Sequence, residues 1–130
     1  MFIGDLSHKG IRTESAAATF NLDSSITSVA AVGKPVALVG DFEVGFGADG
    51  AEIIGYLESY EERTVEGGKL GTVTWHMSAE FSYTGTAPAA GDRVASDGAG
   101  NVKVAGAGVG YNTLVTAVDT DNEIVSVLFR

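Results

Sequence analysis

A regular alternation of short strand-forming runs and turn-forming clusters constrains this chain more than any other feature. After Gly33, runs rich in β-branched and aromatic residues are separated by Gly, Asp and Asn about every ten residues. This spacing is typical of an antiparallel barrel or sandwich. We therefore expect an all-β fold, a small antiparallel β-barrel or sandwich. Its expected strands cover residues 35–39, 42–46, 52–61, 70–77, 80–83, 92–96, 101–105, 113–119 and 123–129.

The N-terminal quarter lacks this alternation. Its apolar residues are scattered among Ser, Thr and Ala, and ordering a backbone costs roughly 1–2 kcal/mol per residue. We therefore expect an extended or partly disordered N-terminal arm over residues 1–32 and a β-barrel-like domain over residues 33–130. Residues 25–31 could form a short helix with Asp23 or Ser24 as its N-cap. The alternative is that the arm pairs as an additional strand within its own subunit or trimer.

Composition narrows the function classes. The chain has 130 residues, of which 45% are hydrophobic, enough for one substantial core. Its 17 acidic residues against 8 basic ones give a net charge of −9, which opposes binding to a phosphate backbone. The absence of cysteine excludes disulfides and thiolate chemistry. No apolar run reaches the roughly 18 residues of a membrane span, and the N-terminus has no signal-peptide pattern. We expect a soluble protein without nucleic-acid or membrane partners.

A glycine-rich and acidic stretch over residues 96–101 suggests either a metal loop or a turn. A calcium loop needs six to eight oxygen ligands, and a helix-flanked loop starting at Asp97 would need a glutamate where the chain has Gly108. We therefore predict a hairpin whose turn is Asp97 to Asn101, with no metal. The run GAGVGY at residues 106–111 places Tyr111 where a dinucleotide fingerprint needs its third glycine, so it also predicts a turn and no cofactor.

Four carboxylates could supply the acid and base of a glycosidase, and they are Glu58, Glu61, Glu62 and Glu66. Their position at a strand end and loop favours solvated charges instead. His8 and His76 have no identifiable partner, and no Gly-x-Ser-x-Gly elbow occurs. We expect no catalytic residues and no enzyme activity, with a small β-barrel hydrolase that uses the Glu58 to Glu66 carboxylates as one alternative.

Three aromatic residues offer a second alternative. Trp75, Phe81 and Tyr83 could form a sugar-stacking platform, and the protein would then be a carbohydrate-binding or host-attachment module of a virion. Aromatic residues at a period of two on neighbouring strands are more often part of a core. Exposure of all three in one shallow groove would favour the binding module.

The last predicted strand is apolar on both faces. Ile124 and Leu128 point one way, while Val125, Val127 and Phe129 point the other. A single small barrel does not obviously cover both faces. We therefore expect a homo-oligomer in which Val125, Val127 and Phe129 form the subunit interface.

The order of turns and strands from Gly33 onward resembles that of bacteriophage capsid decoration proteins, also called cement or head-stabilising proteins. The resemblance is carried by GKPVAL at residues 33–38, DGAEIIGYLE at 49–58, AGDRVASDGAGNVKV at 90–104 and the closing apolar strand. It covers about three quarters of the chain. These segments match in their pattern of turns and strands rather than in a chemical signature.

The resemblance implies a function and a location. Proteins of this family bind the outer surface of a completed capsid, usually as trimers, and an N-terminal arm engages the shell. We therefore expect a structural virion protein, made in the host cytoplasm, that binds the major capsid protein and stabilises the shell. The expected capsid-binding residues are the larger apolar side chains of the arm, which are Phe2, Ile3, Leu6, Ile11, Phe20 and Leu22.

Overall fold

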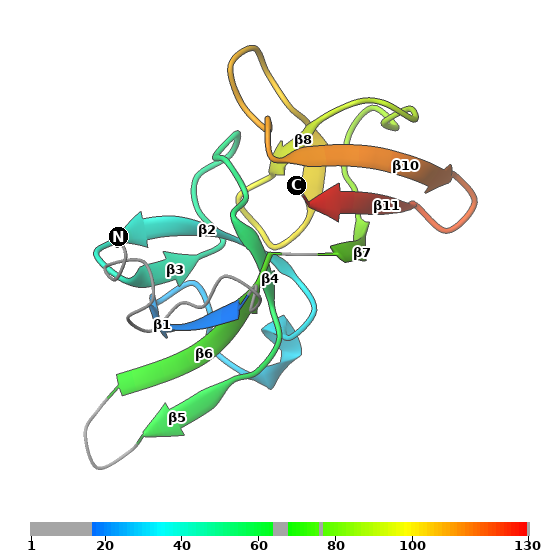
Figure 1. Cartoon of the computed structure of the whole chain (residues 1–130). Helices are drawn as coiled ribbons and strands as arrows, with labels where there is room; N and C mark the ends of the chain where they lie inside the picture. The colour runs from blue at the N-terminus through cyan, green and yellow to red at the C-terminus, as the bar shows by residue number, and fades with distance from the viewer. Residues whose placement is uncertain (1–16, 64–67, 76, 130) are drawn as a thin grey trace.

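The structure is a computed structural model that describes residues 17–63, 68–75 and 77–129. These residues form strands and one short 3₁₀ helix (Figure 1), which confirms the predicted all-β fold. The elements are β1 Ala17–Leu22, η2 Val29–Ala31, β2 Pro35–Gly40, β3 Glu43–Gly45, β4 Gly55–Leu57, β5 Glu61–Arg63, β6 Gly68–Thr74, β7 Met77–Ser82, β8 Val94–Ser96, β9 Val102–Val104, β10 Thr113–Asp119 and β11 Ile124–Phe129. No helix of these residues is long and apolar enough to cross a membrane.

The first six strands form the part of the molecule that we call the barrel lobe. Strands β1, β3, β2, β4 and β6 pair in that order, and pairing of β1 with β6 closes the barrel, while β5 extends β6. All pairs are antiparallel except β1 with β3. The lobe encloses its own core of buried apolar residues, which are Leu22, Ile26, Ala31, Val36, Val44, Leu57 and Val73.

The remaining strands form the C-terminal lobe. One sheet has the order β10-β11-β7, and β8 pairs with β9 in a separate hairpin. Their buried residues form a second core together with Ile53, namely Phe81, Tyr83, Val94, Val102, Val115, Val125, Val127 and Phe129. Hydrogen bonds join the lobes, because Ser96 N donates to Ala51 O over 2.9 Å and Gly50 N donates to Ser96 O over 2.7 Å.

The predicted N-terminal arm is wrong for residues 17–32. Strand β1 pairs with β6 from Ala17 opposite Thr74 to Asn21 opposite Leu70, and it also pairs with β3. The alternative of an additional strand within the subunit is therefore confirmed for β1. Its backbone pairs with β3 on one side and with β6 on the other. Residues 1–16 lie outside the described residues.

The short helix predicted over residues 25–31 is reduced to the 3₁₀ turn η2. Its N-cap is Ser28, whose side chain accepts a hydrogen bond from Ala30 N over 3.2 Å. Asp23, one of the two expected N-caps, instead bonds to Ser25 N over 2.9 Å and forms its own local turn. Asx turns of this kind compete with helix formation.

Two predicted strands are divided differently in the structure. Residues 52–61 contain β4 and only the first residue of β5 rather than one strand, and the predicted strand 70–77 ends at Thr74 in β6. The chain then passes from the barrel to the other lobe, where β7 begins at Met77. Gly55 permits the close pairing of β4 with β6, since a Cβ there would lie 2.3 Å from Thr74 O.

The predicted subunit interface on the last strand is also wrong. Val125 and Val127 are 0% exposed and Phe129 is 3% exposed within a single chain. Their face of β11 belongs to the C-terminal core, while Ile124, Ser126 and Leu128 on the other face are half-buried. Residues of β7, β10 and the β8–β9 hairpin therefore bury this face of β11 within the subunit.

Candidate binding surface

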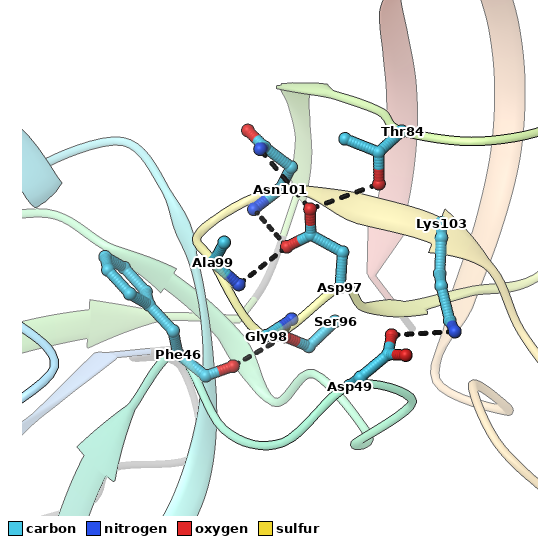
Figure 2. A network of polar contacts seen from close by, with 9 residues as sticks. All are labelled: Phe46, Asp49, Thr84, Ser96, Asp97, Gly98, Ala99, Asn101 and Lys103. Atoms are coloured by element: carbon cyan, nitrogen blue, oxygen red, sulfur yellow. Dashed lines mark hydrogen bonds and ion pairs between the residues drawn. The ribbon is translucent and has the colours of Figure 1, made fainter.

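The acidic stretch after β8 is a turn closed by one carboxylate (Figure 2). Asp97 Oδ1 accepts hydrogen bonds from Ala99 N over 2.8 Å and from Asn101 N over 3.0 Å. Its Oδ2 accepts from Thr84 Oγ1 over 3.1 Å and from Asn101 Nδ2 over 3.4 Å. Gly98 and Gly100 take positive φ angles of 88° and 95°, which glycine adopts at little cost. The predicted hairpin turn is therefore confirmed.

The hydrogen bonds also set the electrostatics of this turn. Partial burial raises the pKa of Asp97, but the four donors outweigh it and the pKa lies below its usual value. The two oxygens are thus occupied by donors of the chain itself. Within residues 17–63, 68–75 and 77–129, no group of three or more His, Asp or Glu side chains could hold a metal ion.

The glutamates considered for hydrolysis do not converge in the described residues. Glu61 and Glu62 are exposed neighbours on β5, so their side chains point to opposite faces of the strand. Glu58 Oε1 accepts a hydrogen bond from Thr74 Oγ1 over 2.7 Å, and Glu61 lies 3.6 Å from the Arg63 side chain. Glu66, His8 and His76 lie outside the described residues.

The three aromatic residues considered for sugar stacking lie in different environments. Phe81 and Tyr83 are 3% and 7% exposed and belong to the C-terminal core. Trp75 is half-buried and packs against the barrel core. The hypothesis of a shared stacking groove is therefore wrong for these residues, because two of the rings are buried in the protein itself.

The expected capsid-binding residues also separate. Phe2, Ile3, Leu6 and Ile11 lie outside the described residues. Leu22 is 6% exposed in the barrel core, so it cannot serve as an anchor for a partner. Phe20 is half-buried and lies beside Phe42, with ring centroids 6.2 Å apart.

Phe20 belongs to an exposed apolar surface that the sequence analysis missed. We call it the Phe42 patch, and it consists of Phe20, Leu38 and Phe42. Leu38 is 56% exposed and Phe42 is 66% exposed. Phe20, Leu38 and Phe42 line an open, mainly apolar hollow together with Gly40 and Asp41. The patch brings β1 together with the β2–β3 hairpin at one end of the barrel lobe (Figure 1).

The backbone at the tip of this hairpin is strained. Phe42 has a φ of +50°, a left-handed conformation that costs a bulky residue roughly 1–2 kcal/mol. The register shifts between Leu38 and Gly40, and Asn21 N donates to Phe42 O over 2.8 Å. The hairpin and β1 therefore hold Phe42 in a conformation that displays its ring, and strain of this kind is concentrated at functional sites.

Acidic residues flank the Phe42 patch. Asp41 is exposed beside the ring, and Glu43 follows it in β3. The sequence does contain a signal, because the hairpin tip Gly40-Asp41-Phe42 places an aromatic side chain where turns usually carry small or polar residues. The predicted strand over residues 42–46 places Phe42 inside a sheet, whereas β3 begins at Glu43 and leaves Phe42 at the hairpin tip.

Comparison with known proteins does not assign this chain to a family. No protein-family model matches the chain, and no curated protein is significantly similar to it. The geometry of the described residues therefore carries the functional argument.

Proposed function

We propose that this protein is a structural virion protein that binds the outer surface of a bacteriophage capsid and stabilises the shell. The observation that carries the proposal is the Phe42 patch, an exposed aromatic cluster on a strained hairpin of a very acidic protein. Contiguous exposed apolar surface marks sites of contact with other proteins. The pattern of turns and strands that resembles decoration proteins supplies the class of partner, which is the major capsid protein.

The Phe42 patch leaves apolar side chains available for burial by a partner. Completely burying a side chain such as Phe or Leu contributes about 1.5–3 kcal/mol relative to leaving it exposed. Phe42 and Leu38 are both more than half exposed, so each retains much of this contribution for a partner. Asp41 and Glu43 provide an acidic rim, and we propose a complementary partner surface that is apolar at its centre and basic around it.

The remaining parts of the proposal follow from the resemblance to capsid decoration proteins. The protein acts without catalysis, is made in the host cytoplasm and is located on the outer surface of the virion. It functions as a homo-oligomer, and the resemblance implies three copies. Because Val125, Val127 and Phe129 are buried in their own subunit, the contact between copies must use another surface than this face of β11.

Decoration of capsids that lack the protein tests this proposal. Purified protein is added to such heads, and bound copies are counted after sedimentation. We expect the wild-type protein to bind and the Phe42→Ser variant to bind at least tenfold more weakly. Val29→Ser is the matched control, because Val29 is 67% exposed on η2 and lies outside the patch.

Two results would contradict different parts of the proposal. Failure of the wild-type protein to bind heads would overturn the virion function. Binding by Phe42→Ser as tight as that of the wild type would leave decoration standing but remove the Phe42 patch from it.

A further inference from the structure

Two hollows adjoin on the surface of the C-terminal lobe. The first has a volume of about 320 Å³ and is lined by Arg93 among others, and the second has about 480 Å³ and is lined by Lys103 among others. Val104 lines both hollows, so they meet at this side chain, which is 37% exposed. The glycine-rich loop between β9 and β10, which projects from the lobe in Figure 1, forms one wall of the first hollow. We call the two hollows together the Val104 site.

The first hollow holds a positive and a negative side chain that do not pair with each other. The guanidinium carbon of Arg93 lies 4.1 Å from the ring centroid of Tyr111, and among the described residues no carboxylate lies within ion-pair distance of it. A guanidinium stacked on a ring keeps the N–H donors at its edge available. Asp92 Oδ2 accepts a hydrogen bond from Ala89 N over 2.8 Å, and no donor in the described part of the chain reaches its Oδ1. This hollow therefore offers both donors and an acceptor to a ligand.

The second hollow has a similar mixture of groups. Lys103 Nζ lies 2.7 Å from Asp49 Oδ1 (Figure 2). An ammonium carries three donors and a carboxylate carries two oxygens, so both members of this pair can bind a further group. Thr84 and Thr86 add their hydroxyls to the lining. Thr84 Oγ1 donates to Asp97 Oδ2 over 3.1 Å and can still accept a hydrogen bond.

The charges of the two hollows favour a neutral polar ligand. An anion would approach Asp92 or Asp49, and the net charge of −9 opposes it further. A cation would approach Arg93 or Lys103. An apolar ligand would exclude water from these polar groups without replacing their hydrogen bonds. None of the described residues that line either hollow is aromatic, so a planar base would have no ring on which to stack.

We propose that the Val104 site binds a neutral oligosaccharide. A sugar hydroxyl donates and accepts hydrogen bonds at the same time, so neighbouring hydroxyls of one ring can bind the Asp92 carboxylate and the Arg93 guanidinium together. The carbon-bound hydrogens of a sugar ring form an apolar face that can pack on Val104. Two adjoining hollows suit two successive rings of one chain.

This site is different from the surfaces considered above. It relies on hydrogen bonding rather than on the aromatic stacking that the structure excludes for the buried rings. It lies on the C-terminal lobe, whereas the Phe42 patch lies on the barrel lobe. The inference therefore goes beyond the proposed binding to the shell and does not depend on it.

Nitrogen-15 NMR titration of the full chain tests the Val104 site without capsids. The neutral probes are maltohexaose, cellohexaose and chitohexaose, and the comparison probes are oligogalacturonate as an acidic sugar chain and capped tetraglycine as a neutral peptide. At probe concentrations up to about 10 mM, we expect at least one neutral hexaose to bind saturably and to shift backbone amides in both hollows. The matching monosaccharide should bind at least tenfold more weakly, because it fills only one hollow.

Two variants remove different features of the first hollow. Arg93→Ala removes the guanidinium donors, and Gly106→Val adds bulk to the lining without changing a charge, so each should weaken binding at least tenfold. Gly106 has no positive φ, and a Cβ there meets no atom within 4 Å, so valine should be tolerated.

The matched controls lie in the barrel lobe. Arg63→Ala on β5 removes the same charge, and Gly68→Val on β6 makes the same change at a glycine whose Cβ also meets no atom within 4 Å. Both should bind the sugar like the wild type. The amide spectrum of each variant shows directly whether it is folded.

Three results would overturn the proposal. The first is the absence of amide shifts in both hollows with every neutral hexaose. The second is binding of Arg93→Ala and Gly106→Val at wild-type strength. The third is tighter binding of oligogalacturonate or the peptide than of every neutral hexaose, which would assign the site to another class of ligand. A failure of the wild type to decorate heads would leave the titration unaffected, so the two proposals can fail separately.

Discussion

The β2–β3 and β8–β9 hairpins each carry an aspartate near the tip, yet they use the turn in different ways. In the β8–β9 hairpin, the Asp97 carboxylate accepts four hydrogen bonds and glycines take the positive φ angles. In the β2–β3 hairpin, the positive φ falls on Phe42, whose ring is 66% exposed. The first tip satisfies its own polar groups, whereas the second accepts strain and exposes apolar surface.

The two hairpin tips also differ in their contacts with the rest of the protein. Beside the Asp97 turn, Lys103 pairs with Asp49, and Ser96 Oγ donates to Phe46 O over 2.5 Å, so this hairpin ties the C-terminal lobe to the barrel lobe (Figure 2). The Phe42 tip packs on its neighbouring strand β1, where Asn21 N donates to Phe42 O and the Phe20 ring lies beside the Phe42 ring. One turn is thus built for stability, whereas the other leaves apolar surface exposed, as the proposed contact with a partner requires.

The largest expected effect on stability comes from removing the carboxylate of the stable turn. Asp97→Ala should lower the free energy of unfolding by about 2 kcal/mol, because hydrogen bonds to a charged group contribute about 1.5–3 kcal/mol. Asp41→Ala at the other tip is the matched control and should change it by less than about 0.5 kcal/mol. Urea unfolding measures both variants, and equal losses would remove the distinction between the two tips.

A smaller and opposite effect is expected at the strained tip. Phe42→Gly should raise the free energy of unfolding by about 0.5 kcal/mol, because relief of the left-handed strain exceeds the lost contact with Phe20. The same variant should bind heads at least tenfold more weakly than the wild type. Gain of stability with loss of binding is the expected signature of a functional site. A destabilised Phe42→Gly variant would show that Phe42 serves the fold.

The smallest expected effect is a dependence of stability on pH. The pKa of Asp97 is lowered in the folded protein, so its contribution is complete above the unfolded value of about 3.9. That contribution is lost as the pH falls through the folded pKa. The pKa of Asp119 is also lowered, chiefly by hydrogen bonds from Asn122. The contribution of Asp119 to stability is therefore lost over the same acidic pH range. Below about pH 4, urea unfolding of Asp97→Asn should therefore depend less on pH than that of the wild type, and identical slopes would contradict the assignment to Asp97.

Local turn chemistry was predictable from the sequence alone. The Asp97 to Asn101 turn follows from residues within five positions of one another, and so does the pairing of β8 with β9 on either side of it. The predicted alternation of valines about an exposed lysine is wrong, because Val104 is exposed and Lys103 is half-buried. Glycine and aspartate act on the backbone next to them, so their effect needs no knowledge of distant residues. The all-β fold and most strand positions could be predicted for the same reason.

Strand pairing and burial were decided by the tertiary structure. Whether β1 lies free or closes the barrel depends on the edges of β3 and β6, which are remote in sequence. Val125 has the same pattern whether it faces a neighbour or its own core, and only the packing of β7 and the β8–β9 hairpin selects the core. The exposure of Phe42 is likewise set by packing, which cannot be predicted from the sequence pattern. The sequence shows which apolar or charged side chains favour burial or pairing. The tertiary structure determines whether other residues of the same chain bury or pair them.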